Sequence, residues 1–373
     1  MIHVSTPSRL CLFGEHQDYL NLEVFALAID LRFFATITPR CDDIFHIAIR
    51  DKRIARLCQK NQHHLYENYF IHAHQPITYE NKRDYLKSSI RILLRQRYPI
   101  DHGFDITMNS DIPIGKGMCS SSSMIVALIK AILEGIGHPD KDNPAKIAHL
   151  AFLAEVAEFG EPGGMMDHYT SAMGGLVHLD FADGITTAST VDVNIPGCFI
   201  LFDSLTQKDT TGVLTSAKVP TLQALEQLSS YGINSVADFL QDPRKIDLLS
   251  KLDETLRRKL AANIDNYRIL KQAKQLFESK TVDPILLGQL LYKHHTNLRD
   301  GLNLSTPIIE KIMNTALAHG ALGGKINGSG GGGCLFVYAH EKDAAGIIDQ
   351  VEKIGYPGKI LTADTGVRID KEE

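Results

Sequence analysis

The chain has 373 residues, of which 44% are hydrophobic and 22% are charged, and its formal net charge at pH 7 is −5. A chain of this length and composition is expected to be globular and long enough for two lobes with a cleft between them. The slightly acidic charge provides no general attraction for nucleic acid or an anionic membrane, which favours a small-molecule ligand held by local groups.

The cysteines and the N-terminus indicate the cellular compartment. Six cysteines are scattered without a C-x-x-C pair or the Cys/His spacing of a zinc site, so we expect reduced thiols. The first residues lead directly into a strand, without the basic and then apolar pattern of a secretion signal, and no apolar run is long enough to cross a bilayer. We therefore expect a cytoplasmic protein.

A polar loop follows the first predicted strands. Residues 2–4 and 10–13 are expected to be short strands on either side of a turn at 6–8, and the apolar run 25–37 predicts a buried strand. Glu15, His16 and Asp18 therefore lie in a loop held between two strands. Such loops commonly carry ligand contacts, although a solvated surface turn has the same composition.

The next segment, residues 41–83, is rich in histidine but lacks the i, i+4 spacing that a zinc helix uses, so we expect surface loops and strands there. Residues 84–97 have the periodicity of a helix.

A glycine-serine segment, residues 113–123 (PIGKGMCSSSS), connects a predicted strand at 104–108 to an apolar helix at 124–133. Gly115 and Gly117 allow backbone conformations that are closed to other residues, and the serines can cap the first amides of the helix. Free N–H groups at the positive end of a helix dipole bind anions, most commonly phosphate. The alternative is that the serines only cap a core helix.

The sequence from 144 to 159 is again helical, and residues 160–164 (GEPGG) interrupt it before a second helix that begins at 165–168. Asp167 falls in the first turn of that helix, where the dipole favours an acid. It is therefore either a capping residue or an ionised group that can orient or deprotonate a hydroxyl.

The second half of the chain is mostly helical. Strands are predicted at 174–181 and 199–203, and the polar stretch between them is taken as the boundary of two lobes, 1–185 and 186–373. A polar loop follows at 203–211. The helices expected beyond it are residues 221–231, 236–240, 256–279, 283–298 and 307–319.

The densest glycine stretch is the segment 323–334, called here the glycine-rich segment. It contains a literal G-x-G-x-x-G at 328–333, but it leads into an apolar strand at 334–339 and not into a helix. A dinucleotide-binding unit needs the helix and a further acidic residue, so that interpretation is rejected. A flexible linker is also excluded, because linkers do not lie between an apolar helix and a buried strand.

Three segments resemble, in the same order, the three motifs of the GHMP kinases, the superfamily of galactokinase and of homoserine, mevalonate and phosphomevalonate kinases. They are residues 9–19 (RLCLFGEHQDY), 113–123 (PIGKGMCSSSS) and 325–334 (KINGSGGGGC). The string GEHQDY is similar to the sugar-binding motif of galactokinases. The resemblance covers nearly the whole chain.

This resemblance implies an α+β fold of two lobes. Residues 1–185 would form an N-terminal lobe like the second domain of ribosomal protein S5, carrying the ATP and sugar motifs. Residues 186–373 would form a helix-rich α/β C-terminal lobe that carries the third motif. The implied activity is that of an ATP- and Mg²⁺-dependent sugar 1-kinase, most closely a galactokinase, with a sugar and ATP as its partners and neither nucleic acid nor a membrane.

The resemblance also implies roles for individual residues. Asp167 would be the catalytic base, with Arg9 beside it to keep it ionised and to offset charge on the transferring group. Ser121 and Glu155 would hold Mg²⁺. The predicted sugar-binding residues are Glu15, His16, Asp18 and Gly164. The predicted ATP-binding residues are Pro113, Gly115, Lys116, Gly117, Met118, Cys119, Ser120, Ser121, Ser122, Gly330 and Gly331.

Two departures from the galactokinase pattern leave alternatives open. Gly163 replaces the cysteine of the usual Pro-Cys-Gly, and residues 208–213 lack the tyrosine that helps to shape the sugar pocket. The sugar could therefore be L-arabinose, galacturonate, an N-acetylhexosamine or a heptose phosphate. A catalytically silent regulator that binds sugar and nucleotide is a further alternative, which the presence of the predicted base and metal ligands disfavours.

Overall fold

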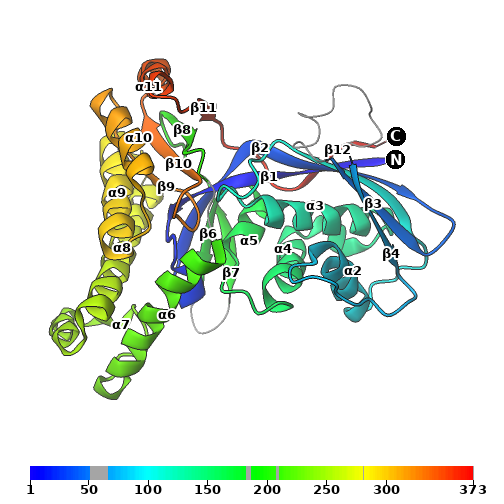
Figure 1. Ribbon diagram of the computed structural model, residues 1–373, viewed down its shortest axis with the longest axis horizontal. Coiled ribbons are helices and arrows are strands. Elements are labelled where there is room, and N and C mark those ends of the chain that lie inside the picture. Colours follow the sequence, from blue (N-terminus) through cyan, green and yellow to red (C-terminus); the bar gives the residue numbers. More distant parts are fainter. Residues whose placement is uncertain (51–65, 182–185, 207–209, 280, 373) are drawn as a thin grey trace.

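The computed structural model describes residues 1–50, 66–181, 186–206, 210–279 and 281–372. Two β-sheets organise this part of the chain, and helices cover them (Figure 1). The larger sheet has eight strands in the order β12-β1-β2-β5-β3-β4, with β6 paired to β2 and β7 paired to β6. Its strands are β1 (Ile2–Phe13), β2 (Val24–Pro39), β3 (Ile44–Arg50), β4 (Tyr66–His72), β5 (Phe104–Ser110), β6 (Leu176–Asp180), β7 (Thr187–Val191) and β12 (Arg368–Glu372).

Four helices cover one face of the larger sheet (Figure 1). They are α2 (Tyr85–Arg95), α3 (Ser120–Gly135), α4 (Pro144–Phe152) and α5 (Met166–Met173). The central helix α3 is apolar nearly all round and packs on β1 and β2, so its N-terminus is held firmly against the strand that carries Arg9.

The smaller sheet has four antiparallel strands in the order β11-β8-β10-β9. They are β8 (Cys198–Asp203), β9 (Gly323–Ile326), β10 (Cys334–Ala339) and β11 (Gly358–Leu361). The helices that accompany this sheet are α6 (Thr210–Leu228), α7 (Asp238–Gln241), α8 (Glu254–Glu278), α9 (Pro284–Thr296), α10 (Pro307–Ala318) and α11 (Glu341–Lys353). Short 3-10 helices span Asp18–Leu20, Pro139–Asp142, Ser229–Tyr231 and Pro243–Lys251, and π-helical turns span Leu153–Ala157 and Asn297–Gly301.

The two central strands of the smaller sheet, β8 and β10, are buried on both faces, which explains their continuous apolar sequence. In β8, Phe199 and Leu201 belong to the main core, whereas Ile200 and Phe202 belong to a second core shared with α10 and α11. Side chains alternate between the faces of a strand, so one apolar run serves two cores.

A buried carboxylate joins the large sheet to α8. Glu23, just before β2, is 2% exposed and accepts hydrogen bonds from His178 (3.0 Å), Tyr267 (3.1 Å), Lys274 (2.8 Å) and Lys271. Burial acts to raise the pKa of Glu23, but the hydrogen bonds from His178 and the two lysines outweigh it, and the pKa lies below its usual range. An unpaired charge in this position would be costly, so the contact holds the hairpin of β1 and β2 against α8.

Most predicted elements are confirmed, and three are wrong. The turn predicted at 6–8 is absent, because β1 continues through Pro7 with a register shift between Pro7 and Ser8 that accommodates the ring. Helix α6 begins at Thr210, although a loop was predicted there, because packing against α8 overrides the weak helix propensity of threonine and glycine. Strand β7 lies in the stretch predicted as a connection, since its residues are polar and partly exposed at a sheet edge.

The sequence-based expectations about thiols and membranes can be compared with the described residues. Cys11, Cys41, Cys119 and Cys198 are free thiols, and Cys58 lies outside the described residues. None of the helices in the described part of the chain combines the length and the apolar character that are needed to span a bilayer. His63 and His64, in the histidine-rich segment, also lie outside the described residues.

Candidate functional site

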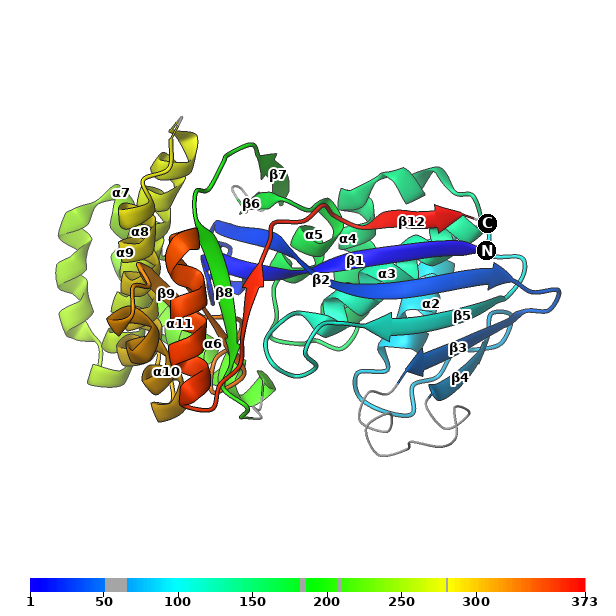
Figure 2. The ribbon, with the colours of Figure 1, turned by 90° about the horizontal axis from the view of Figure 1, so that it is seen from above.

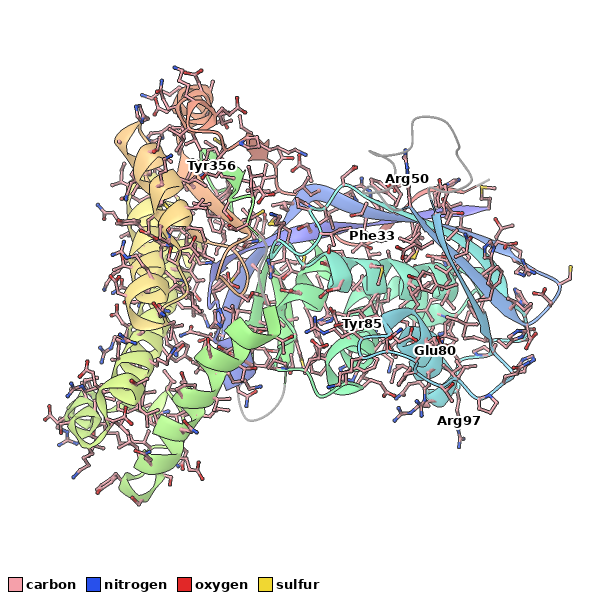
Figure 3. The ribbon with its side chains drawn as sticks, viewed as in Figure 1. Phe33, Arg50, Glu80, Tyr85, Arg97 and Tyr356 are labelled. Carbon is pink, nitrogen blue, oxygen red and sulfur yellow. The ribbon has the colours of Figure 1, made fainter. Side chains whose placement is uncertain are left out.

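A cleft with a volume of about 330 Å³ opens where α3 and α5 begin, beside the loop that follows β1. Segments far apart in the sequence contribute to its wall, including the start of α2, the glycine-serine segment, the π-helical turn Leu153–Ala157, the loop before α5, helix α6 and the glycine-rich segment. Figure 3 shows Tyr85, one of the lining residues, in the middle of the molecule, whereas Arg97 beyond the other end of α2 lies at the periphery.

The N-terminus of α3 faces this cleft without a side-chain cap. Cys119 is the N-cap residue, with a left-handed backbone (φ 46°), and its side chain makes no capping hydrogen bond. The prediction that the serines act as caps is wrong, because their hydroxyls have tertiary partners: Ser122 donates to Glu155 (2.7 Å) and Ser123 donates to the Pro7 carbonyl (3.0 Å). The first turn of α3 thus lines the cleft without a side-chain cap, and an uncapped helix N-terminus is an environment that favours an anion.

The predicted ATP-binding residues divide into two groups. Gly115, Gly117, Met118, Cys119, Ser120, Ser121 and Ser122 line the cleft. Pro113, Lys116, Gly330 and Gly331, all within the described residues, do not contribute to that lining. Lys116 is instead an anchor: its ammonium pairs with Asp203 (3.0 Å) and donates to the Thr206 carbonyl (3.1 Å), and its own carbonyl accepts the Cys334 N–H (2.8 Å).

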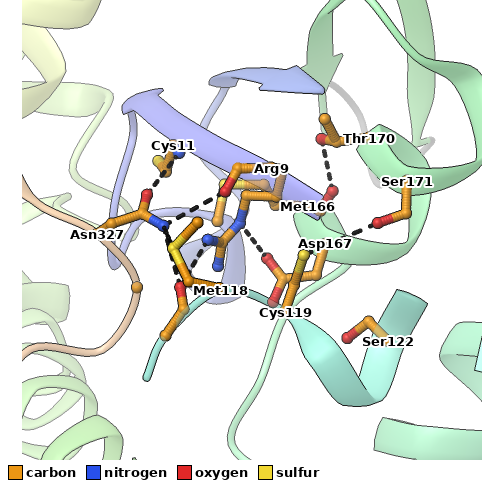
Figure 4. A network of polar contacts seen from close by, with 12 residues as sticks. Arg9, Cys11, Met118, Cys119, Ser122, Met166, Asp167, Thr170, Ser171 and Asn327 are labelled. Atoms are coloured by element: carbon orange, nitrogen blue, oxygen red, sulfur yellow. Dashed lines mark hydrogen bonds and ion pairs between the residues drawn. The ribbon is translucent and has the colours of Figure 1, made fainter. Parts of the chain in front are cut away.

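Arg9 and Asp167 form an ion pair at the base of the cleft. The Arg9 Nε donates to Asp167 Oδ1 at 2.7 Å, and the guanidinium also donates to the Gly117 carbonyl at 2.9 Å (Figure 4). Burial acts to lower the pKa of Arg9, but the nearby negative charge of Asp167 outweighs it and the pKa is raised overall. The Asp167 side chain is 27% exposed, so it can meet a ligand while Arg9 stays buried.

Glu155 lies in the π-helical turn that interrupts the predicted helix 144–159, and such turns are frequent at functional sites. Its Oε2 accepts from Ser122 (2.7 Å) and from His168 Nε2 (2.8 Å). Burial acts to raise the pKa of Glu155, but hydrogen bonds from His168, Ser121 and Ser122 lower it overall. An ionised carboxylate and a serine hydroxyl at the cleft form an oxygen donor set of the kind that Mg²⁺ prefers.

The predicted sugar loop is held tightly by other parts of the chain. Glu15 is 3% exposed, and its Oε2 accepts from Lys325 (2.8 Å) and from the Gly328 N–H (3.0 Å). His16 is paired through both ring nitrogens, with the Tyr19 hydroxyl (2.8 Å) and the Ser329 carbonyl (3.0 Å). Both residues line the cleft, but these contacts already fix their orientation.

Asp18 lies close to Asp167. Its carboxylate accepts the N–H groups of Tyr19 (2.9 Å) and Met166 (3.4 Å), and no cationic side chain among the described residues pairs with it. Burial and then the charge of Asp167 raise the pKa of Asp18 to about 6. A Cβ at Gly164 would lie 2.0 Å from Asp18 Oδ2, so only glycine allows this approach.

Sequence reasoning missed several lining residues at the mouth of the cleft. The Arg83 guanidinium contacts Glu161 (2.6 and 2.9 Å) and Thr211 of α6, and the Tyr85 hydroxyl donates to Glu161 (2.9 Å). It also missed His168, which directly follows Asp167. The contacts of these residues join segments that are distant along the chain, so local sequence patterns do not reveal them. The one available signal is that each residue lies near a recognised motif in the sequence.

Phosphoryl transfer depends on positioning and charge neutralisation more than on covalent chemistry, and this cleft supplies both. The class of protein that the fold and the cleft define is a phosphotransferase whose acceptor is the hydroxyl of a small molecule.

Comparison with known proteins identifies the family. Residues 84–175 match the GHMP kinases N terminal domain, residues 273–357 match the GHMP kinases C terminal domain, and residues 2–39 match the galactokinase galactose-binding signature. The chain belongs to the GHMP kinase family, which implies ATP as the phosphoryl donor.

Individual relatives cover almost the full chain. The galactokinase of Bacillus subtilis (strain 168) is 27% identical, over 96% of this chain and 92% of its own length. The mevalonate kinase of Thermococcus onnurineus is 24% identical, over 98% of both chains. Among solved structures, Lactococcus lactis galactokinase complexed with galactose has a TM-score of 0.82 at 20% identity, covering 98% of this chain and 94% of its own. The two-lobed GHMP kinase fold is thereby confirmed.

The raised pKa of Asp18 generates a prediction about stability. Because the folded state holds this proton more tightly than the unfolded state, whose pKa is near 3.8, stability is lost as the pH rises from about 4 to about 6. Asp18→Asn avoids the loss and should be more stable than the wild type above pH 6, by about 1–3 kcal/mol. Urea unfolding at pH 4, 5, 6 and 7.5 measures the difference.

A second background provides the control. In Asp167→Asn, where the neighbouring charge is gone, the gain from Asp18→Asn should shrink. A difference between the wild type and Asp18→Asn that stays constant from pH 4 to 7.5 would show that Asp18 does not carry the raised pKa.

Proposed function

We propose that this protein is an ATP-dependent sugar 1-kinase whose substrate is D-galactose. The observation that carries the proposal is the position of the loop 14–19, within the galactokinase signature, beside the Arg9–Asp167 pair and the uncapped N-terminus of α3 in one cleft. The relatives that are named galactokinases support the choice of sugar.

In the proposed reaction, the γ-phosphate of ATP lies at the amides that begin α3, and the sugar lies beside Asp18. Asp167 accepts the proton of the C1 hydroxyl while the C1 oxygen bonds to the γ-phosphorus and the bond to the ADP oxygen breaks. Arg9 donates to Asp167 Oδ1, which leaves the second carboxylate oxygen to take the proton and places a positive charge near the transferring group.

Ser121 and Glu155 are the residues that we propose would hold Mg²⁺. Their oxygens suit a hard cation, and Glu155 is kept ionised by its hydrogen bonds. A bound Mg²⁺ would neutralise charge on the phosphates. Glu155 retains this role only if His168 and Ser122 keep it oriented, since both bond to the same carboxylate oxygen.

The charge balance of the cleft favours a neutral sugar. Each carboxylate except Asp18 has a cationic or imidazole partner among the described residues. These pairs are Glu15–Lys325, Glu155–His168, Glu161–Arg83 and Asp167–Arg9. The remaining charge, on Asp18, would repel a carboxylate or phosphate on the sugar, which argues against galacturonate and a heptose phosphate as substrates.

Two further assignments remain proposals. We place the enzyme in the cytoplasm, where free thiols such as those of Cys11 and Cys119 persist. We also propose residues 1–185 and 186–373 as the two functional lobes, with the ATP and sugar motifs in the first and the glycine-rich segment in the second, although β12 returns to pair with β1.

The base is tested by Asp167→Asn. The amide has the same shape but cannot accept a proton, so kcat should fall by about 100- to 10,000-fold while sugar and ATP still bind. Steady-state kinetics and calorimetric titration of both substrates measure the two effects. Asp140→Asn, which lies outside the cleft lining, is the control and should be fully active. Near-normal turnover by Asp167→Asn would remove this residue from the chemistry.

The metal site is tested by Ser121→Ala and Glu155→Gln. Each variant removes one oxygen ligand from an ion that tolerates poor geometry badly, so each should need about 10-fold or more Mg²⁺ for half-maximal activity. Glu158→Gln, in the same segment but outside the cleft lining, should keep the wild-type Mg²⁺ dependence. If all three variants behave like the wild type, the metal is held elsewhere.

The sugar is tested by ADP release with a panel of sugars. Galactose should be phosphorylated at O1, with glucose far poorer, because a site that bonds a particular hydroxyl rejects the epimer by factors of up to about 10⁴. Asp18→Ala should lose this discrimination. Activity with arabinose, galacturonate or a heptose phosphate but none with galactose would refute the galactose assignment, and transfer to mevalonate or homoserine would refute the sugar kinase itself.

A further inference from the structure

The carbonyl of Gly117 lies where three distant segments of the chain meet. It accepts one hydrogen bond from the Arg9 guanidinium (2.9 Å) and a second from the side-chain amide of Asn327 (3.0 Å) (Figure 4). The same guanidinium bonds to Asp167, so a shift of Gly117 would move Arg9 and change the geometry of the Arg9–Asp167 pair. Gly117 also precedes by three residues the first residue of α3, whose amides form the anion site.

Asn327 uses its whole side-chain amide to join these segments. Its Oδ1 accepts the Cys11 N–H (3.0 Å), and its Nδ2 donates to the carbonyls of Gly117 (3.0 Å) and Arg9 (3.3 Å). The side chain is fully buried, and its backbone N–H is bonded to the Cys334 carbonyl (3.1 Å). One residue of the glycine-rich segment thus connects the catalytic strand to the glycine-serine segment.

The backbone around Asn327 is arranged to receive this amide. The β1–β2 register shifts between Cys11 and Phe13, an irregularity that accompanies the bond from the Cys11 N–H to Asn327. A Cβ on Gly328 would lie 2.7 Å from the Gly117 carbonyl oxygen, so glycine is needed for the two segments to approach this closely. The contact is therefore built by several residues and does not depend on Asn327 alone.

We propose that Asn327 is a positioning residue that fixes the distance between the glycine-serine segment and the Arg9–Asp167 pair. In terms of the proposed function, on which this inference rests, it aligns the γ-phosphate with the C1 hydroxyl of the sugar. Asparagine suits the role because its side chain both donates and accepts. An ionised aspartate has no N–H to donate. Its carboxylate oxygen would lie against the carbonyl oxygens of Gly117 and Arg9, which are also acceptors.

Kinetics of Asn327→Ala and Asn327→Asp test the alignment. Asn327 does not line the cleft, so its loss should leave substrate binding largely intact and lower kcat. We expect kcat per folded molecule to fall by about 10- to 100-fold in Asn327→Ala, and further in Asn327→Asp, with each KM changed by less than about 3-fold. Unchanged kcat, or a loss confined to KM, would overturn the proposal.

A matched variant separates alignment from stability. Asn266→Asp places the same buried carboxylate in α8, where Asn266 contacts Asn297 and no residue of the cleft among its described hydrogen bonds. It should lower the melting temperature as the Asn327 variants do, but keep the wild-type kcat per folded molecule. A kcat for Asn266→Asp as low as that of Asn327→Asp would attribute the loss to destabilisation and overturn the proposal.

Hydrogen exchange of the ligand-free protein provides a test that does not depend on the sugar. In Asn327→Ala, the amides of residues 115–122 should exchange at least about 10-fold faster, while those of α8 stay unchanged. If Asn327→Ala does not fold, Asn327→Ser, which keeps one donor and one acceptor, takes its place. Unchanged exchange at 115–122 overturns the positioning role. If Asn327→Ala alters the exchange at 115–122 but the wild type phosphorylates no sugar, the proposed function is refuted and the positioning role of Asn327 stands.

Discussion

The site depends on one buried ion pair, between Lys325 and Glu15. The lysine side chain is fully buried, and its ammonium also donates to the carbonyls of Cys11 and Ile326 (2.8 and 2.7 Å). An isolated charge in this position would be prohibitive, and breaking such a pair costs about 3–5 kcal/mol. The loop after β1 and the strand β9 must therefore be in place together, although 310 residues separate the two side chains in sequence.

A buried histidine near Lys325 also restricts how the loop after β1 and the strand β9 can pack together. His294 on α9 is fully buried and stacks on Phe13 (6.1 Å), and burial together with the neighbouring charge of Lys325 lowers its pKa well below the usual range. A neutral imidazole can lie beside a buried ammonium, whereas an imidazolium could not. A neutral His294 is thus compatible with the charge of Lys325, which favours the arrangement of the loop 14–19 in which Glu15 pairs with that lysine.

The sequence predicts those features that depend on local pattern. The helix at 84–97, the buried strand at 25–37 and the strand-to-helix turn at 113–123 follow from periodicity, glycine and serine, and the structure contains them. The pairing of Arg9 with Asp167 came from family resemblance, because nothing local connects residues 158 positions apart. Two ion pairs, Lys116–Asp203 and Arg83–Glu161, were not predicted for the same reason. Each joins distant segments that only the tertiary packing brings together.

Strand β12 connects the end of the described chain to its beginning. It pairs with β1 at residues 2–5, so β12 lies beside the start of β1, near the end marked N (Figure 2). During synthesis, β12 emerges long after β1, so the edge of β1 at residues 2–5 stays unpaired until β12 has been made. The strand that carries Arg9 is therefore completed only after translation of residue 372. Because this pairing is non-local, completion of the strand beside the Arg9–Asp167 pair is expected to be slow, and the exposed edge of β1 is where a folding intermediate is prone to associate with other chains.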